Sequence, residues 1–539
     1  MYKSTFRFLP VSLSAFLVEL RSLDETLDLF AGLQAASLQG VRELIPAART
    51  VLVVFAPHET SATILAGQIA RMNLKAGYRQ AGQSVEVPVD YNGEDLAEVA
   101  EITGLTVAEV IRRHTESDYV VAFCGFAPGF GYLTGGDPAL HVPRRKTPRT
   151  RIPAGAVGLA GGFSGVYPQA SPGGWQIIGT TPVKMWDLAR TPSSFFQPGY
   201  RVKFLDQAVS KKDYYIPLPA PHDQDLSNAF KGDRFLSILA APLPALFQDL
   251  GRVGQTGQGV SSSGALDKQS FKAANRLVGN PVTTPCLELT GGGFKFSSAG
   301  SVVVGFTGAP CNLEIRTSAG ACLKPAFYTP VALETGDEVT LSSPTSGMRS
   351  YMSVRGGFVV DKPLGSAATD TLAGVGPSPV RAGSRLGVGA AEGLSPVSLF
   401  ERPSINFPKA GETVELDVVL GPRCDWFTPE SLHIFTMTSW EVTAQSNRVG
   451  VRLAADEVLR RSITAELPSE GCVAGALEVP ADGKPLLLLA DHPLTGGYPV
   501  IGVVADYHLD LAGQIPAGAK IRFRPRADFT DILPDPLLA

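Results

Sequence analysis

The chain has 539 residues, which at the usual ~100–200 residues per domain corresponds to roughly three or four domains. Its 57 glycines and 42 prolines exceed average usage without reaching the level of collagen or a low-complexity chain, and they favour short strands joined by tight turns. The 47 basic and 51 acidic residues form no long block of one sign, which argues against nucleic acid or a membrane surface as a partner.

The apolar segments are short. Purely apolar runs such as 486–490 are far shorter than the ~20 residues that span a bilayer, so no transmembrane helix is expected. The apolar stretch 8–20 follows Lys3 and Arg7, but Pro10 and Glu19 interrupt it, which favours a first β-strand over a signal peptide. The six scattered cysteines have no C-x-x-C spacing and predict reduced thiols in a cytoplasmic protein.

Residues 1–82 are predicted to form a small α+β domain. Ser22 and Glu25 have the spacing of a capping box at the start of a helix. The run 51–56 is then a buried strand, and 59–73 a second helix.

Residues 83–206 are predicted to form a second domain, a β-barrel. An alternating strand at 85–91 and two short helices within 94–115 precede the strand YVVAFCGF (119–126). Helical periodicity then gives way to glycine-rich turns and short apolar runs, which a compact closed barrel needs.

The polar, proline-bearing stretch 207–234 is predicted to link two independently folded halves. Residues 235–530 again show short strands separated by glycine and proline, so this half is expected to be nearly all β. A short echo between GYLTGGDPALHVPRR (131–145) and SVRGGFVVDKPLGS (353–366) favours related barrel units in the two halves.

A cluster of basic side chains lies between the glycine-rich segments FCGFAPGFGYL (123–133) and SPGGWQIIGTTP (171–182). Such a cluster can clamp a carboxylate or phosphate through bidentate guanidinium contacts, and the alternative is a solvated basic loop. Its members are Arg144, Arg145, Lys146, Arg149 and Arg151.

These segments of the first half closely resemble the first component of the allophanate hydrolase-like family, which includes the B subunit of 5-oxoprolinase and the sporulation-kinase inhibitor KipI. In the second half, the segments that carry a resemblance are FQDLGRVGQTGQGVSSSGALDKQSFKAANRLVGN (247–280), LELTGGG (287–293) and ADHPLTGGYPVIGVV (490–504). They resemble the companion chain, the C subunit of 5-oxoprolinase or KipA, which is similar to the carboxyltransferase domain of urea carboxylase. The resemblance implies a natural fusion of two subunits and a mainly β fold: an α+β N-terminal domain followed by cyclophilin-like β-barrel domains, with two such subdomains in the carboxyltransferase-type half 235–530.

The loop 251–264 combines five glycines with three serines. Its backbone N–H groups could bind an oxyanion. It matches neither phosphate-binding glycine signature, so a Walker-type nucleotide site is not predicted. The helix expected after this loop carries Asp267, Asn275 and Asn280. These side chains either belong to the site or cap the helix at the surface.

Three further segments combine charged or hydroxyl groups with glycine-rich turns. RGGF (355–358) together with GSAATD (365–370) could stabilise an oxyanion. SNRVG (446–450) has the same combination of groups, and the alternative is that it forms only a turn held by Asn447. Asp491 and His492 end a predicted strand just before Thr495, a position suited to acid–base chemistry, and Asp491 is favoured over His492.

The predicted catalytic residues are Asp491, Arg149 and Arg355, and alanine at Arg149 or Asp491 is expected to abolish turnover without unfolding. The predicted substrate-binding residues are Arg144, Arg145, Gly173, Gly174, Trp175, Asp249, Arg252, Ser263, Asp267, Ser446, Arg448, Thr495, Gly496, Gly497 and Tyr498. No metal centre is expected, since the seven histidines are scattered without ligand spacing.

The resemblance implies the fused B and C subunits of an ATP-dependent 5-oxoprolinase, with ATP and magnesium as cofactor, a small-molecule substrate and a separate A subunit as partner. Phosphorylating the amide oxygen helps to open a lactam, and an arginine-rich, glycine-lined site balances the phosphate charge. One alternative is biotin-dependent carboxyl transfer to a urea-like amide, with biotin on another chain because this chain lacks an attachment motif. Another is a regulatory kinase inhibitor and antagonist. Homo-oligomerisation is left open.

Overall fold

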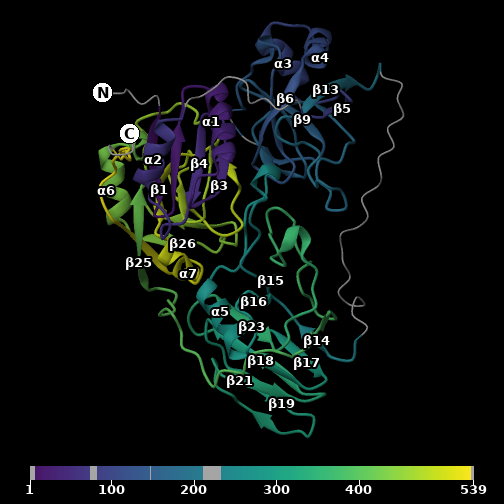
Figure 1. Cartoon of the computed structure of the whole chain (residues 1–539), viewed down its shortest axis with the longest axis vertical. Helices are drawn as coiled ribbons and strands as arrows, with labels where there is room; N and C mark the ends of the chain where they lie inside the picture. Colours follow the sequence, from purple (N-terminus) through teal and green to yellow (C-terminus); the bar gives the residue numbers. More distant parts are fainter. Residues whose placement is uncertain (1–5, 73–81, 146, 148, 210–231, 536–539) are drawn as a thin grey trace.

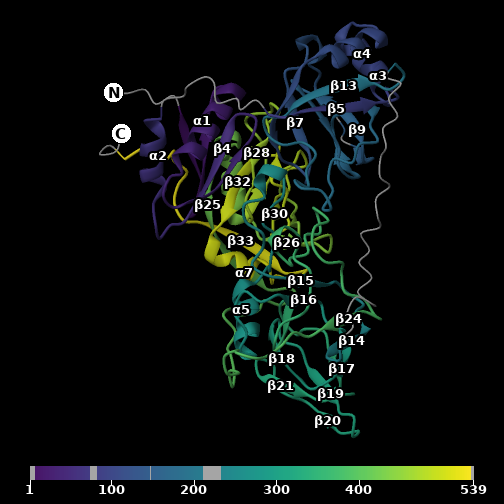
Figure 2. The same ribbon diagram turned by 45° about the vertical axis from the view of Figure 1, so that its right-hand side comes forward.

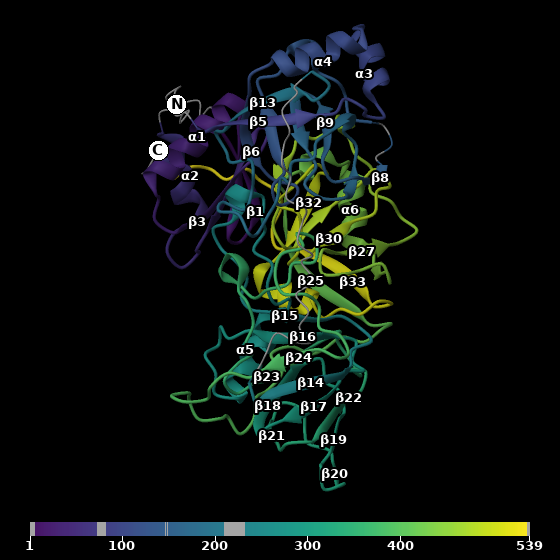
Figure 3. The same cartoon turned by 90° about the vertical axis from the view of Figure 1, so that its right-hand side faces the viewer.

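The computed structural model describes residues 6–72, 82–145, 147, 149–209 and 232–535. These form four bodies, which we name the N-terminal domain (6–72), the first barrel (82–209), the sandwich domain (232–408) and the C-terminal barrel (409–535). The N-terminal domain lies beside the C-terminal barrel (Figure 1). Figure 3 shows the first barrel above the C-terminal barrel and the sandwich domain below it. Within the predicted linker 207–234, residues 210–231 lie outside the described residues.

In the N-terminal domain, two helices cover one face of a four-stranded sheet of order β1-β2-β4-β3, and together they form one apolar core. The predicted cap is confirmed, since Ser22 Oγ accepts the backbone N–H of Glu25 at 3.3 Å. The elements are β1 (Arg7–Ser12), β2 (Ala15–Glu19), α1 (Leu23–Ala36), β3 (Val41–Pro46), β4 (Thr50–Phe55) and α2 (Ala62–Ala70).

The first barrel is a seven-stranded sheet of order β12-β9-β10-β7-β6-β13-β5, whose two edges approach each other through an isolated bridge between Asp90 and Thr180. Its strands are β5 (Ser84–Val89), β6 (Tyr119–Cys124), β7 (Gly131–Thr134), β9 (Ala156–Ala160), β10 (Phe163–Val166), β12 (Gln176–Thr180) and β13 (Arg201–Asp206). The two predicted helices are α3 (Leu96–Thr103) and α4 (Val107–Glu116). A separate ribbon pairs β8 (Arg149–Ile152) with β11 (Ser171–Gly173).

The sandwich domain packs a six-stranded sheet of order β20-β19-β22-β17-β14-β24 against a five-stranded sheet of order β15-β16-β23-β18-β21, with an apolar core between them. The helix α5 (Lys268–Leu277) covers the second sheet. The strands are β14 (Phe235–Ala240), β15 (Ala245–Gln248), β16 (Cys286–Thr290), β17 (Lys295–Ala299), β18 (Val302–Gly308), β19 (Leu313–Arg316), β20 (Cys322–Leu323), β21 (Pro330–Leu333), β22 (Glu338–Leu341), β23 (Arg349–Val354) and β24 (Arg385–Gly387).

The C-terminal barrel is closed, with the order β25-β32-β29-β30-β27-β26-β33. Its strands are β25 (Thr413–Leu420), β26 (Trp440–Val442), β27 (Gly450–Ala454), β29 (Ala476–Glu478), β30 (Leu486–Leu488), β32 (Val500–Val504) and β33 (Lys520–Pro525). The helices α6 (Pro429–Met437) and α7 (Leu509–Ala512) accompany it, and a ribbon pairs β28 (Glu470–Gly471) with β31 (Thr495–Gly496). The predicted fold class, mainly β with barrel domains and an α+β N-terminal domain, is confirmed.

The two barrels share one strand order. Each strand of the first barrel and its ribbon, from β5 to β13, has a counterpart from β25 to β33, including the parallel pair of first and last strands and the separate two-stranded ribbon. The sequences PGGW (172–175) and TGGY (495–498) begin in equivalent ribbon strands, β11 and β31. The relation between the halves therefore lies in these segments, and not in the 131–145 and 353–366 echo.

The N-terminal sheet turns its second face toward the C-terminal barrel. Leu17 and Leu52 of that face belong to one apolar cluster with Leu488 and Val503 of the barrel. Figure 2 shows β4 beside β28, where the backbone N–H of Ala48 donates to Ser469 O at 3.1 Å. The first and last parts of the chain thus share a core, which removes apolar surface of both from water. None of the helices in the described ranges is long and apolar enough to cross a membrane.

Candidate active site

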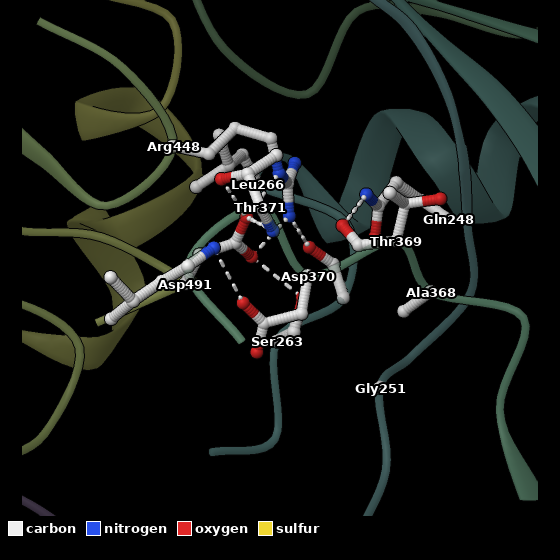
Figure 4. Close-up of polar contacts among 12 residues, drawn as sticks. Gln248, Gly251, Ser263, Leu266, Ala368, Thr369, Asp370, Thr371, Arg448 and Asp491 are labelled. Carbon is white, nitrogen blue, oxygen red and sulfur yellow. Dashed lines mark hydrogen bonds and ion pairs between the residues drawn. The ribbon is translucent and has the colours of Figure 1, made fainter. Parts of the chain in front are cut away.

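An ion pair between Arg448 and Asp491 lies where the sandwich domain meets the C-terminal barrel (Figure 4). Asp491 follows β30 and is completely buried, and Arg448, just before β27, is 5% exposed. Two hydrogen bonds of 3.0 Å join them, from Nε to Oδ2 and from Nη2 to Oδ1. Burial alone would raise the pKa of Asp491, but the guanidinium of Arg448 holds that pKa below its usual value.

Two loops of the sandwich domain donate hydrogen bonds to the same carboxylate. Ser263 Oγ donates to Oδ1 at 2.6 Å, and the backbone N–H and Oγ1 of Thr371 donate to Oδ2 at 2.9 and 2.8 Å. Ser263 has a φ of 52°, a left-handed conformation that costs energy for a residue with a side chain. Asp491 therefore acts as the anion that aligns Arg448 and two loops, and its substitution should cost stability as well as activity.

Arg448 has a second buried anion, Glu288 of β16. Its Nη1 donates to Glu288 Oε1, while Tyr351 Oη and the backbone N–H of Leu266 donate to Oε2 at 2.7 and 3.1 Å. Arg349 Nε lies 3.7 Å from Glu288 Oε1. One guanidinium thus bridges carboxylates of two domains, and removing it would leave both buried without the cation that they share.

Arg252 is the arginine of this region with two buried donor groups left unused by the described residues. It is 2% exposed, and its Nη2 donates to Ala368 O, but its Nε and Nη1 have no hydrogen-bond partner within the described ranges. Burial lowers the pKa of its guanidinium. Because buried donors without acceptors are costly, these two N–H groups indicate a place for an oxygen of a ligand or water.

The carboxylates of Asp249 and Asp370 lie close enough to Arg252 to interact with its charge. Asp249 accepts hydrogen bonds from Ser366 Oγ at 2.6 Å and from the backbone N–H groups of Gly251 and Ala367 at 2.8 Å. Asp370 accepts the backbone N–H of Ala373 at 2.8 Å; its burial, and the charge of Asp491, raise its pKa to about 6.

Three predicted residues serve local structure instead. Asp267 caps α5, where Oδ1 accepts the backbone N–H of Ser270 at 2.9 Å, and burial raises its pKa to about 6. Arg355 Nη1 donates to the carbonyl oxygens of Val278 and Ser395 at 2.8 and 2.7 Å. Ser446 Oγ donates to Thr443 O at 2.8 Å within a turn.

The basic cluster of the first barrel meets a carboxylate that the sequence pattern does not connect with it. Asp95, 2% exposed, accepts hydrogen bonds from Arg145 Nη1 at 2.5 Å and from Arg149 Nη1 and Nη2 at 2.8 and 2.7 Å. These bonds raise the pKa of Arg149. Both arginines therefore anchor the start of α3; Lys146 lies outside the described residues, and Arg151 is exposed.

The PGGW segment belongs to an aromatic core. Trp175 is 6% exposed and packs edge-on against Phe130 and Tyr132 with ring centroids 5.2 and 5.6 Å apart. A side chain at Gly173 would collide with Tyr167, and Gly174 O accepts the backbone N–H of Arg145 at 2.7 Å. These residues shape the loop that presents the arginines.

Arg144 and the TGGY segment meet at the interface of the two barrels. Arg144 Nε lies 2.8 Å from Glu466 Oε1, and a Cβ at Gly497 would lie 3.1 Å from its Nη1. Thr495 Oγ1 accepts the backbone N–H of Phe126 at 2.9 Å. A side chain at Gly496 would collide with Glu478, and Tyr498 is 43% exposed. The structure therefore brings predicted residues of the two halves together at a second place.

Gly125→Ala is expected to destabilise this interface by about 1–3 kcal/mol, the usual cost of overpacking. Its new Cβ would meet Thr495 Oγ1 and lie 2.8 Å from Cγ2. In a double-mutant cycle read by urea unfolding, Thr495→Ala should recover part of the loss, because it removes both clashing atoms. Purely additive effects of the two substitutions would contradict the contact.

The sequence pattern does not indicate Glu288 and Thr371 as candidate site residues, and it includes Ser261 and Asp370 only as members of the serine loop and of GSAATD. Thr371 follows the GSAATD segment directly. No sequence signal pairs Glu288 with Arg448, 160 positions away. No group of three or more His, Cys, Asp or Glu side chains in the described part of the chain could hold a metal ion.

Comparison with known proteins gives two family models in succession. "Carboxyltransferase domain, subdomain C and D" matches residues 6–196, and "Carboxyltransferase domain, subdomain A and B" matches residues 258–525. The C subunit of 5-oxoprolinase from Escherichia coli (strain K12) is 33% identical over 53% of this chain and 90% of that protein. The chain belongs to this carboxyltransferase-domain family.

Each half of this carboxyltransferase-domain protein has its own relative. The B subunit of 5-oxoprolinase from Escherichia coli O157:H7 is 38% identical over 32% of the chain and 80% of that protein. The crystal structure of TTHA0988 matches 95% of this chain and 99% of its own, with a TM-score of 0.80 and 31% identity. The predicted resemblance to fused B and C subunits is confirmed. The homologues are components of an enzyme, which supports a 5-oxoprolinase-like or carboxyltransferase role.

Proposed function

We propose that this protein supplies the B and C subunits, fused in one chain, of an ATP-dependent 5-oxoprolinase. It would activate the 5-oxoproline lactam for hydrolysis to glutamate, together with a separate A subunit. The similarity of each half to one 5-oxoprolinase component supports this function. The observation that carries it is the buried Arg252, whose two unpartnered N–H groups lie among loops that the Arg448–Asp491 pair holds together.

Lactam activation places negative charge on the amide oxygen or on a phosphoryl group attached to it. Donors fixed beforehand in a buried site stabilise such charge far better than water-exposed donors, because nothing needs to reorganise. The planar guanidinium of Arg252 suits two oxygens of one group. Asp249, Ser366 and Ala367 fix the neighbouring turn through hydrogen bonds of 2.6 and 2.8 Å, which keeps that site in place.

The residues present fit an anionic group, and we propose that Arg252 would hold a phosphoryl oxygen of ATP. When bound, ATP would supply the phosphoryl group that makes the lactam carbonyl reactive. The carboxylates of Asp249 and Asp370 already accept several hydrogen bonds each, so they do not form a cage for magnesium. Magnesium would therefore arrive with the nucleotide, as it commonly does.

The test is ATP-dependent formation of glutamate from 5-oxoproline by the full-length protein with a 5-oxoprolinase A subunit. Glutamate should form only when ATP, the A subunit and this protein are all present. Omission of each component in turn is the control. ATP-dependent glutamate formation by the A subunit alone, or none with the complete mixture, would contradict the proposal.

A second function, biotin-dependent carboxyl transfer to a urea-like amide, is favoured by the family models, which are named for the carboxyltransferase domain. Biotin would then come on a carrier from another chain. The protein should transfer carbon dioxide from a carboxylated biotin carrier to urea, measured with radioactive bicarbonate. Transfer to urea without any reaction of 5-oxoproline would favour this second function.

A further inference from the structure

A cavity of about 390 Å³ lies between the N-terminal sheet, the serine loop 261–266 and the C-terminal barrel. Part of its wall belongs to the apolar cluster between the two domains, including Ala15 and Ile45 on one side and Cys472 and Leu494 on the other. This volume lies within the range of small-molecule sites, and the apolar wall suits an aliphatic group.

Glu43 of β3 is the carboxylate that faces this cavity from the N-terminal domain. Its Oε1 accepts the backbone N–H of Gly254 at 3.2 Å, and no ion pair to Glu43 occurs within the described ranges. Burial raises its pKa. A partly buried carboxylate without a cation is costly, so it favours a ligand that brings positive charge.

The other titratable side chains of the cavity also favour a positively charged ligand. Asp506 and Asp510 are two further carboxylates, and Lys268 is the single ammonium among the lining side chains. His492 Nδ1 lies 2.8 Å from Pro493 O, so Nδ1 carries the proton and Nε2 is left as an acceptor, since burial lowers the pKa and keeps the ring neutral. Acceptors and negative charge thus exceed donors and positive charge.

We propose that this cavity binds a small organic cation, a compact aliphatic primary amine whose ammonium group pairs with Glu43 while its carbon chain contacts the apolar wall. The ammonium offers three N–H donors, which Glu43, His492 Nε2 and a serine hydroxyl can accept. Ser263 lines the cavity and donates to Asp491 at 2.6 Å, so the ligand lies one side chain away from the candidate active site.

The test uses the full-length protein at pH 8 and three probes with the same carbon chain: n-butylammonium, butyrate and 1-butanol. Isothermal titration should show butylammonium binding about tenfold or more tightly than the other two, the difference that one charge-assisted bond produces. Glu43→Gln should bring its affinity down to that of butanol. Glu441→Gln, at an exposed position of β26, should leave the affinity unchanged.

A second variant tests the location of the binding site independently of the charge of the ligand. Ala474→Leu adds bulk to the cavity wall and should weaken butylammonium and butanol together. Equal affinity in wild type and Glu43→Gln, binding of butyrate as tight as that of the amine, or no effect of Ala474→Leu would each overturn the proposal. The titration contains no nucleotide, 5-oxoproline or partner protein, so such failure leaves the proposed 5-oxoprolinase activity standing.

Discussion

Replacing Arg448 with methionine is expected to lower the free energy of unfolding by about 3–5 kcal/mol. The substitution keeps most of the side-chain volume but leaves Asp491 and Glu288, 0% and 1% exposed, without their shared cation. Because total stabilities are only about 5–15 kcal/mol, a loss of this size should shift the urea midpoint strongly.

Two variants control this prediction. Arg452→Met changes an exposed arginine on β27, the strand that Arg448 precedes, and should alter stability by less than about 0.5 kcal/mol. Adding Asp491→Asn and Glu288→Gln to Arg448→Met should recover part of the loss, since neutral side chains are cheaper to bury than unpaired charges. Equal effects of the Arg448 and Arg452 substitutions would refute the bridging role.

Unlike Arg448→Met, Arg252→Met should cause a large loss of activity and little loss of stability. Turnover should fall about 10²–10³-fold, the usual effect of removing a fixed donor to a developing oxyanion. Stability should change by less than about 1 kcal/mol, because two of the lost N–H groups have no partner to lose. Rates of 5-oxoproline turnover and urea unfolding curves measure the two effects on the same samples.

Two comparisons separate this role from a general need for arginine. Arg252→Lys keeps the charge but not the planar fork, and should remain strongly impaired. Arg355→Met removes donors to two backbone carbonyls outside the site and should retain turnover. Normal turnover in Arg252→Met, or greater loss in Arg355→Met, would show that the anion site is wrongly placed.

The local structure could be predicted well from the sequence where neighbouring residues determine it. Ser22 caps α1 as its spacing indicates, and Gly251 and Gly264 adopt φ values of 92° and 99° in the predicted turn loop. The strand order of the C-terminal barrel could not be predicted, because it depends on pairing β25 with β32 and β33 across the length of the domain.

The site was predicted in part, and distance along the chain explains the difference. Arg448 and Asp491 were nominated separately, but nothing in the spacing shows that they pair or that Glu288 joins them. The density of arginines around Arg149 indicates an anion clamp equally well for a ligand or for a carboxylate of the fold. Asp95, more than fifty positions earlier, occupies that clamp, and only the folded chain brings it there.

The central claim is that this one chain does the work of separate B and C subunits, and the most direct test is to replace those two chains by this protein. A 5-oxoprolinase A subunit that is active with separate B and C subunits is combined with this protein alone, and ADP and glutamate are counted together. The account predicts that both products appear in equal amounts, and that Arg252→Met suppresses both. An A subunit that forms glutamate with its own B and C subunits but none with this protein would contradict the account.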